Sequence, residues 1–170
     1  MPAFHVDSIQ QWESFEHDGV FYDLRHLDCH EVVFQKQGEP IRFVVTYGLH
    51  CFTKNGTGHN ISLMYADGRE SQFICLERYE ASRQLRNIME GLGAGALIYL
   101  TQGESFFTLD VMNNASGAVE PFKICMAIFR EYRVLRIHVT SAFLHALAKD
   151  HQEYLLKRRG SAYSRLRWIL

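Results

Sequence analysis

Polar side chains occupy every second position in the middle of the segment EYRVLRIHVTSAFLH, residues 131–145. Alternate residues of an extended strand share a face, so Arg136, His138 and Thr140 lie on one side. The opposite side is apolar and carries Leu135, Ile137 and Val139. Arginine binds phosphate and histidine transfers protons, so the polar side has the residue types needed to cleave RNA without a metal.

A second predicted strand, Ile41–Thr53, has a comparable polar face with Arg42, Thr46 and His50. If the two strands are neighbours, a histidine could act as acid or base while an arginine neutralises the phosphate. The residues of this hypothetical nuclease site are His138, Arg136, Arg133 and His50. A sheet with one face in water also shows polar residues at every second position, without any catalysis. We favour this structural interpretation and expect no catalytic residue.

Metal chemistry has one candidate, the segment DLRHLDCH, in which His26 and His30 are four residues apart. On a helix, this spacing would place both imidazoles on one face, where they could hold zinc or manganese. The segment precedes a predicted strand, however, and the glutamate of the H-E-x-x-H motif is absent. We therefore favour a turn with satisfied polar groups, and expect neither a metal nor any other cofactor.

Cysteines and glycines give no further site. The four cysteines occur singly, with no C-x-x-C pair, as is typical of small core residues in a reducing compartment; they are Cys29, Cys51, Cys75 and Cys125. His50 and Cys51 are adjacent on a strand and point to opposite faces, so this pair alone makes no Cys–His dyad. The glycines of GLGAGA, residues 91–96, follow a predicted helix, whereas a dinucleotide fingerprint opens one.

Charge is distributed unevenly along a chain whose formal net charge is only −1. Residues 1–40 contain eight acidic and two basic side chains, whereas residues 149–170 contain six basic and two acidic ones. Such asymmetry favours self-association or a charged partner. We expect another protein or a ribonucleoprotein complex as partner, with possible RNA contact through the basic-aromatic tail KRRGSAYSRLRW. Tryptophan, tyrosine and arginine commonly anchor interfaces, and the predicted anchors are Trp12, Tyr163, Arg165, Trp168, Arg158 and Arg159.

Hydrophobic periodicity predicts an α+β fold in a single domain, residues 1–170, with a curved, mostly antiparallel sheet of about six to eight strands. Within it we distinguish an acidic segment (1–22), a sheet-plus-helix core (23–143) and a C-terminal helix with its tail (144–170). A central helix is predicted over residues 78–93 and a C-terminal helix after a cap at Ser141. A short helix is predicted over residues 8–16. We expect a cytoplasmic protein without membrane contact, because neither a signal peptide nor a membrane-length apolar run is present.

Five sequence words carry a resemblance: YDLRHLD, HCFT, RYEASRQL, ESFFTLDV and LRIHVTSAF. Their order resembles a loose family of small bacterial proteins encoded on plasmids and integrated elements, over most of residues 22–143. A fainter similarity, through RVLRI, is to the RelE/ParE toxin superfamily, whose members are usually shorter and strongly basic. The resemblance implies a role in toxin–antitoxin pairs, in defence or in its inhibition.

These observations favour a non-enzymatic, macromolecule-binding protein, an inhibitor or accessory factor in bacterial mobile-element or phage–host conflict. The alternative is a RelE-like, metal-independent endoribonuclease toxin.

Overall fold

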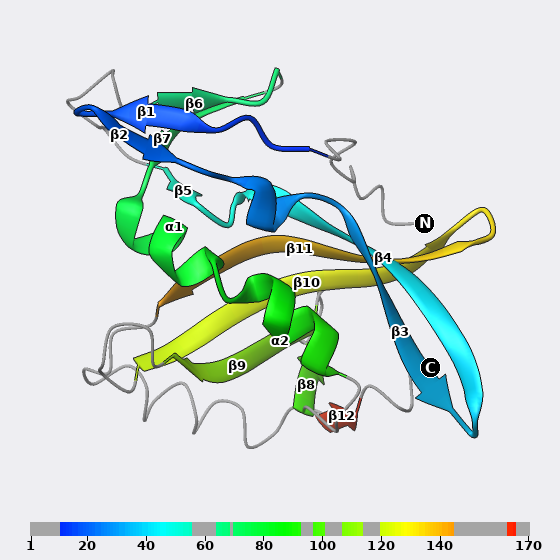
Figure 1. Ribbon diagram of the computed structural model, residues 1–170. Coiled ribbons are helices and arrows are strands. Elements are labelled where there is room, and N and C mark those ends of the chain that lie inside the picture. Colours follow the sequence, from blue (N-terminus) through cyan, green and yellow to red (C-terminus); the bar gives the residue numbers. More distant parts are fainter. Residues whose placement is uncertain are drawn as a thin grey trace.

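The computed structural model describes residues 11–55, 64–68, 70–92, 97–100, 107–113, 120–144 and 163–165. They form an α+β fold in which most residues lie in strands and two short helices pack on one face of the largest sheet (Figure 1). The predicted fold class is confirmed. Most of the predicted C-terminal helix and its tail lies outside the described residues.

The largest sheet has seven strands in the order β12-β8-β9-β10-β11-β4-β3. They are β3 (His30–Lys36), β4 (Glu39–His50), β8 (Leu97–Leu100), β9 (Phe107–Asn113), β10 (Glu120–Glu131), β11 (Val134–Leu144) and β12 (Tyr163–Arg165). All neighbouring strands are antiparallel except β4 and β11, which run parallel. Tight turns join β3 to β4 and β10 to β11, because each pair is a hairpin with a two-residue loop.

Two smaller sheets lie together at one end of the molecule (Figure 1). The first is a hairpin of β1 (Phe15–His17) and β2 (Val20–Tyr22), joined by a two-residue Asp18–Gly19 turn. The second has the order β5-β7-β6 and consists of β5 (Thr53–Lys54), β6 (Met64–Ala66) and β7 (Ser71–Ile74). A 3-10 turn, η1 (Arg25–Leu27), leads from the hairpin into β3.

The helical segment is broken in two, α1 (Leu76–Ser82) and α2 (Leu85–Gly91), where a single helix was predicted over residues 78–93. The hydroxyl of Ser82 donates a 2.6 Å hydrogen bond to the carbonyl of Tyr79, which the amide of Arg83 would bond in a continuous α-helix. The amide of Arg83 bonds the carbonyl of Glu80 instead, three residues back. A side-chain hydrogen bond therefore accompanies the break.

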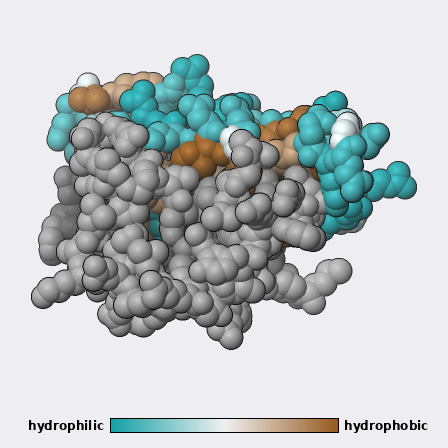
Figure 2. All heavy atoms as spheres, turned by 90° about the horizontal axis from the view of Figure 1, so that it is seen from below, coloured by the Kyte–Doolittle hydropathy of each residue, from teal (hydrophilic) through white to brown (hydrophobic). Residues whose placement is uncertain are grey.

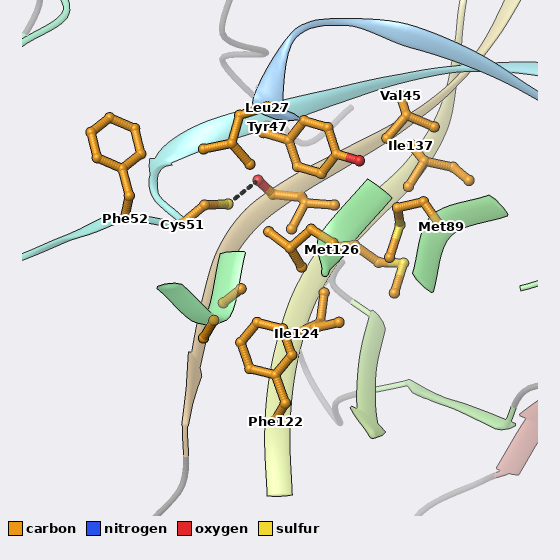
Figure 3. Close-up of a cluster of buried hydrophobic side chains, with 14 of the residues drawn as sticks. Leu27, Val45, Tyr47, Cys51, Phe52, Met89, Phe122, Ile124, Met126 and Ile137 are labelled. Atoms are coloured by element: carbon orange, nitrogen blue, oxygen red, sulfur yellow. Dashed lines mark hydrogen bonds between the residues drawn. The ribbon is translucent and has the colours of Figure 1, made fainter. Parts of the chain in front are cut away.

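The core lies between these helices and the large sheet (Figure 3). Alternate residues of β4 point into it, as the period of two predicts: Phe43, Val45, Tyr47 and Leu49. Ile137 and Val139 enter from β11, and Leu85 and Met89 from α2. Full burial of side chains of this size stabilises the fold by roughly 1.5–3 kcal/mol each.

Two sequence-based predictions about the chain ends are wrong where the structure describes them. Phe15, expected in a helix over residues 8–16, begins strand β1 and stacks on Tyr22 with 4.7 Å between ring centroids. Ser141, expected to cap a helix, lies within β11 opposite Cys125 of β10. In the described part of the chain, no helix has the length and apolar character needed to cross a membrane.

Candidate functional site

The two polar strand faces do come together, because β4 and β11 are neighbours and place Thr46 opposite His138. The hydroxyl of Thr46 and Nδ1 of His138 share a 2.9 Å hydrogen bond. His138 is only 4% exposed and Thr46 is buried as well. The prediction that this face is in water is therefore wrong at its centre, where the hydrogen bond offsets part of the cost of burying both groups.

The arginines of this face are already paired with carboxylates. The guanidinium of Arg136 forms an ion pair with Glu131, and that of Arg42 lies 3.4 Å from the carboxylate of Glu31. His50 lies 3.6 Å from Glu70, at the end of β4 away from Arg42. These carboxylates would compete with a phosphate for the cations. The arrangement favours a structural role for this face over the hypothetical nuclease site.

The two histidines of the hypothetical metal site point to different partners. Nε2 of His26, in η1, lies 2.7 Å from the hydroxyl of Ser82, and Nε2 of His30, in β3, lies 2.8 Å from that of Tyr47. Since Ser82 donates its proton to the Tyr79 carbonyl, its oxygen accepts from His26, so His26 is not placed as a base for a serine nucleophile. Among the described residues, no three potential metal ligands form a group.

Both histidines should make the folded protein sensitive to acid. Burial lowers the pKa of His26 and of His30, and the charge of Arg86 lowers that of His30 further. Below about pH 6.5, the unfolded chain therefore binds protons that the folded chain does not, so stability is complete above this pH and falls as the pH drops. We expect urea denaturation midpoints to decrease from pH 7 to pH 5.5, and to decrease less in a His26→Gln/His30→Gln variant. Equal pH slopes for both proteins would contradict this prediction.

All four cysteines are free thiols. Cys51 and Cys75 are buried, as predicted for small core residues, whereas Cys29 and Cys125 are half-buried. Burial raises the pKa of Cys51 to about 12, and its thiol donates to the carbonyl of Val139. A thiol with this pKa is protonated at neutral pH and is a poor nucleophile.

A pocket of about 250 Å³ opens beside β6 and is the best candidate for a binding site. It is lined by two short segments, Gln11–Glu13 and Tyr65–Asp67. The hydroxyl of Tyr65 donates a 2.7 Å hydrogen bond to the carbonyl of Glu13, which holds the two segments together. The position of Trp12 is fixed from the other side, because its backbone amide donates to the carboxylate of Asp28.

Trp12 gives this pocket an aromatic wall. Its side chain is 4% exposed and packs edge-on against Phe52, with 5.2 Å between ring centroids, and against Tyr65 at 6.0 Å. The indole Nε1 of Trp12 is buried without a hydrogen-bond partner. A buried donor without an acceptor costs free energy of folding, which the packing of the ring against Phe52 and Tyr65 offsets.

Two carboxylates line the pocket, those of Glu13 and Asp67. The β1–β2 hairpin, whose Phe15 packs on Tyr65, carries two more, Glu16 and Asp18. On the same hairpin, Phe21 is 69% exposed. Figure 2 shows hydrophobic side chains at the left end of the view, the end where Figure 1 draws the β1–β2 hairpin. We call this surface the acidic end, defined by Glu13, Glu16, Asp18, Phe21 and Asp67.

The predicted partner-binding residues are only partly placed. Trp12 lines the pocket, while Tyr163 and Arg165 lie in β12, paired in register with Tyr99 and Leu97 of β8. Arg158, Arg159 and Trp168 lie outside the described residues. Sequence reasoning did not find Tyr65 and Asp67, because their contacts with the Trp12 segment cross more than fifty residues of chain. The available signal was the period-two pattern of the hairpin around Asp67, which placed Tyr65 on a strand but not beside Trp12.

The chain is similar to a curated protein, Protein YjaZ of Escherichia coli (strain K12). The two are 35% identical over 147 residues, a match that covers 79% of this chain and 80% of that protein. No solved structure matches the chain.

The family comparison corrects the resemblance inferred from sequence words. Residues 14–166 match the YjaZ family, and nothing supports membership of a plasmid or mobile-element family or kinship with the RelE/ParE toxins. The words RYEASRQL and LRIHVTSAF lie in the helical segment and in β11, two elements that pack the core. Because the match extends over most of the chain, the chain belongs to the YjaZ family.

Proposed function

We propose that this protein is a non-catalytic binding protein whose acidic end takes up a basic, extended segment of a partner protein. The observation that carries the proposal is the pocket beside β6, with its aromatic wall and its carboxylates. An arginine or lysine of the partner would pair with the carboxylates of Glu13 and Asp67, and its stem would pack on the rings.

A peptide fits this chemistry better than a small amine does. A small amine would fill the pocket alone, whereas an extended segment can also contact the β1–β2 hairpin, whose Phe15 packs on Tyr65 of the pocket. The exposed ring of Phe21 adds an apolar contact outside the pocket, as is common around interface anchors.

The proposal retains the binding role and not the setting in mobile-element conflict, because that setting depended on the resemblance that the family comparison overturns. The buried Thr46–His138 pair and the ion pairs of Arg42 and Arg136 also favour binding over RNA cleavage. Arg133, the remaining arginine of the hypothetical nuclease site, lies in the turn between β10 and β11.

The test uses a short synthetic peptide of arginine and tyrosine, titrated into ¹⁵N-labelled protein. The two indole N–H signals of the chain are assigned with a Trp168→Phe variant. We expect the Trp12 signal to move on binding, with an affinity that falls as salt rises. A peptide with citrulline in place of arginine should bind about 10-fold more weakly, since it keeps the carbonyls but loses the charge.

Matched variants locate the binding site. Glu13→Gln together with Asp67→Asn removes both charges but preserves the acceptor oxygens, including the Asp67 oxygen that the amide of Glu70 bonds. We expect this variant to bind the arginine peptide about 10-fold more weakly, while Glu39→Gln, at the start of β4, binds normally. An unmoved Trp12 signal, or equal binding of both peptides, would overturn the proposal.

A further inference from the structure

The turn between β10 and β11 presents a tyrosine to solvent at a strained position. Tyr132 is 95% exposed, the highest exposure among the large hydrophobic residues that the structure describes. Its φ is +53°, in the left-handed region that costs an L-residue other than glycine roughly 1–2 kcal/mol. The first position of such a two-residue turn is ordinarily glycine, asparagine or aspartate.

Of the other two hairpins with a two-residue turn, one follows this rule. Asp18–Gly19 joins β1 to β2, whereas Gln37–Gly38, which joins β3 to β4, has glutamine at the first position; all four residues have positive φ. Both of these turns have glycine at the second position, whereas Tyr132 is followed by Arg133. An exposed aromatic residue that lowers folding stability without packing on anything in the core indicates a role outside folding.

Two arginines flank this tyrosine. Arg130 and Arg133 are exposed, and neither forms an ion pair with a described residue, in contrast to Arg136, which is paired with Glu131. Val134, 41% exposed, adds an apolar side chain at the start of β11. We call Arg130, Tyr132, Arg133 and Val134 the basic tip; Figure 1 shows the turn projecting from the end of the molecule away from the β1–β2 hairpin.

We propose that the basic tip of one molecule docks on the acidic end of a second copy, so that molecules associate head to tail. The inference rests on the proposed function and names the partner: the basic, extended segment is Arg130–Val134 of another copy. The tip supplies arginines for the carboxylates of the acidic end and an aromatic ring for Phe21.

A protein occupant is favoured over RNA by the composition of the tip. Two unpaired arginines with a tyrosine and a valine resemble the centre of a protein interface, which is rich in tyrosine and arginine.

The two ends lie on different surfaces, so the contact is heterologous and leaves one free tip and one free acidic end on every dimer. Association should therefore proceed beyond the dimer as concentration rises. Because it depends on exposed charges, it should weaken with salt.

Sedimentation velocity on the full chain over a concentration series at low salt tests the inference. We expect concentration-dependent growth, which Arg130→Glu/Arg133→Glu (tip variant) and Glu13→Lys/Asp67→Lys (end variant) each weaken at least 10-fold. Lys36→Glu, at the β3–β4 turn, makes the same change of charge per residue as the tip substitutions and should have little effect.

Mixing the two variants gives the decisive result. The tip variant keeps an intact acidic end and the end variant an intact tip. The reversed tip and the reversed end are also opposite in charge, so an equimolar mixture should recover concentration-dependent association that neither variant shows alone. Failure of the mixture to dimerise, with both variants folded by circular dichroism, would overturn the inference.

Tyr132→Asn separates docking from folding. Asparagine tolerates positive φ, so the variant should be as stable as the native chain or more so, yet associate at least 10-fold more weakly. Undiminished association of Tyr132→Asn would count against the tip. If the arginine peptide binds at Trp12 while the native chain shows no self-association, only the identity of the partner is wrong; if neither occurs, the proposed function also fails.

Discussion

Trp12→Ala should lower the free energy of unfolding by about 3–5 kcal/mol, the usual cost of truncating a buried tryptophan. The indole lies against Phe52 and Tyr65, so its removal opens a cavity between the segment before β1 and the three-stranded sheet. Equilibrium urea denaturation, followed by far-ultraviolet circular dichroism, measures the change.

Two further variants show whether packing accounts for this loss. Trp12→Phe keeps a ring in contact with Phe52 and gives up only an indole N–H that has no partner, so it should cost much less than Trp12→Ala. Met64→Ala alters a partly exposed side chain of β6 and should stay within about 0.5 kcal/mol of the native protein. A loss below about 1 kcal/mol for Trp12→Ala would show that Trp12 is not a core residue.

Thr46→Val should destabilise the protein by about 1–3 kcal/mol, because it keeps the shape of the side chain but deprives buried His138 of a hydrogen bond. The ring of His138 makes a further interaction besides this one, so His138→Phe should cost more than the Thr46 bond alone. The double variant should lose about 1 kcal/mol less stability than the sum of the losses in the two single variants. Urea denaturation of the four proteins gives this coupling energy.

This double-mutant cycle also tests the interpretation of the polar face. A coupling energy near zero would mean that the hydrogen bond between Thr46 and His138 does not stabilise the folded protein. The structural role assigned to the β4–β11 face would then lose its main support.

Local patterns predicted most of the strands correctly. Alternation along Ile41–Thr53 and residues 134–143 identified the core-facing side of β4 and β11, and Asp67–Gly68 marked the turn between β6 and β7. These features depend on the period of two and on turn residues that act over a few positions of chain.

Other features depend on contacts that no local pattern contains. The spacing of Ile9, Trp12 and Phe15 fits one face of a helix, but Phe15 is held in β1 by its pairing with Tyr22. The break between α1 and α2 coincides with a side-chain hydrogen bond of Ser82, a residue that helices commonly accommodate. The pocket joins Trp12 to Tyr65, so neither segment reveals it alone.

The parallel pairing of β4 with β11 has a consequence for the protein during its synthesis. Thr46 and His138 are 92 residues apart, and β4 emerges from the ribosome long before β11. Until β11 is synthesised, β4 can pair only with β3, and its other edge has unpaired backbone groups beside Val45 and Tyr47. Unpaired strand edges of this kind promote aggregation of nascent chains. Nearly the whole of the large sheet must therefore be translated before this strand is covered.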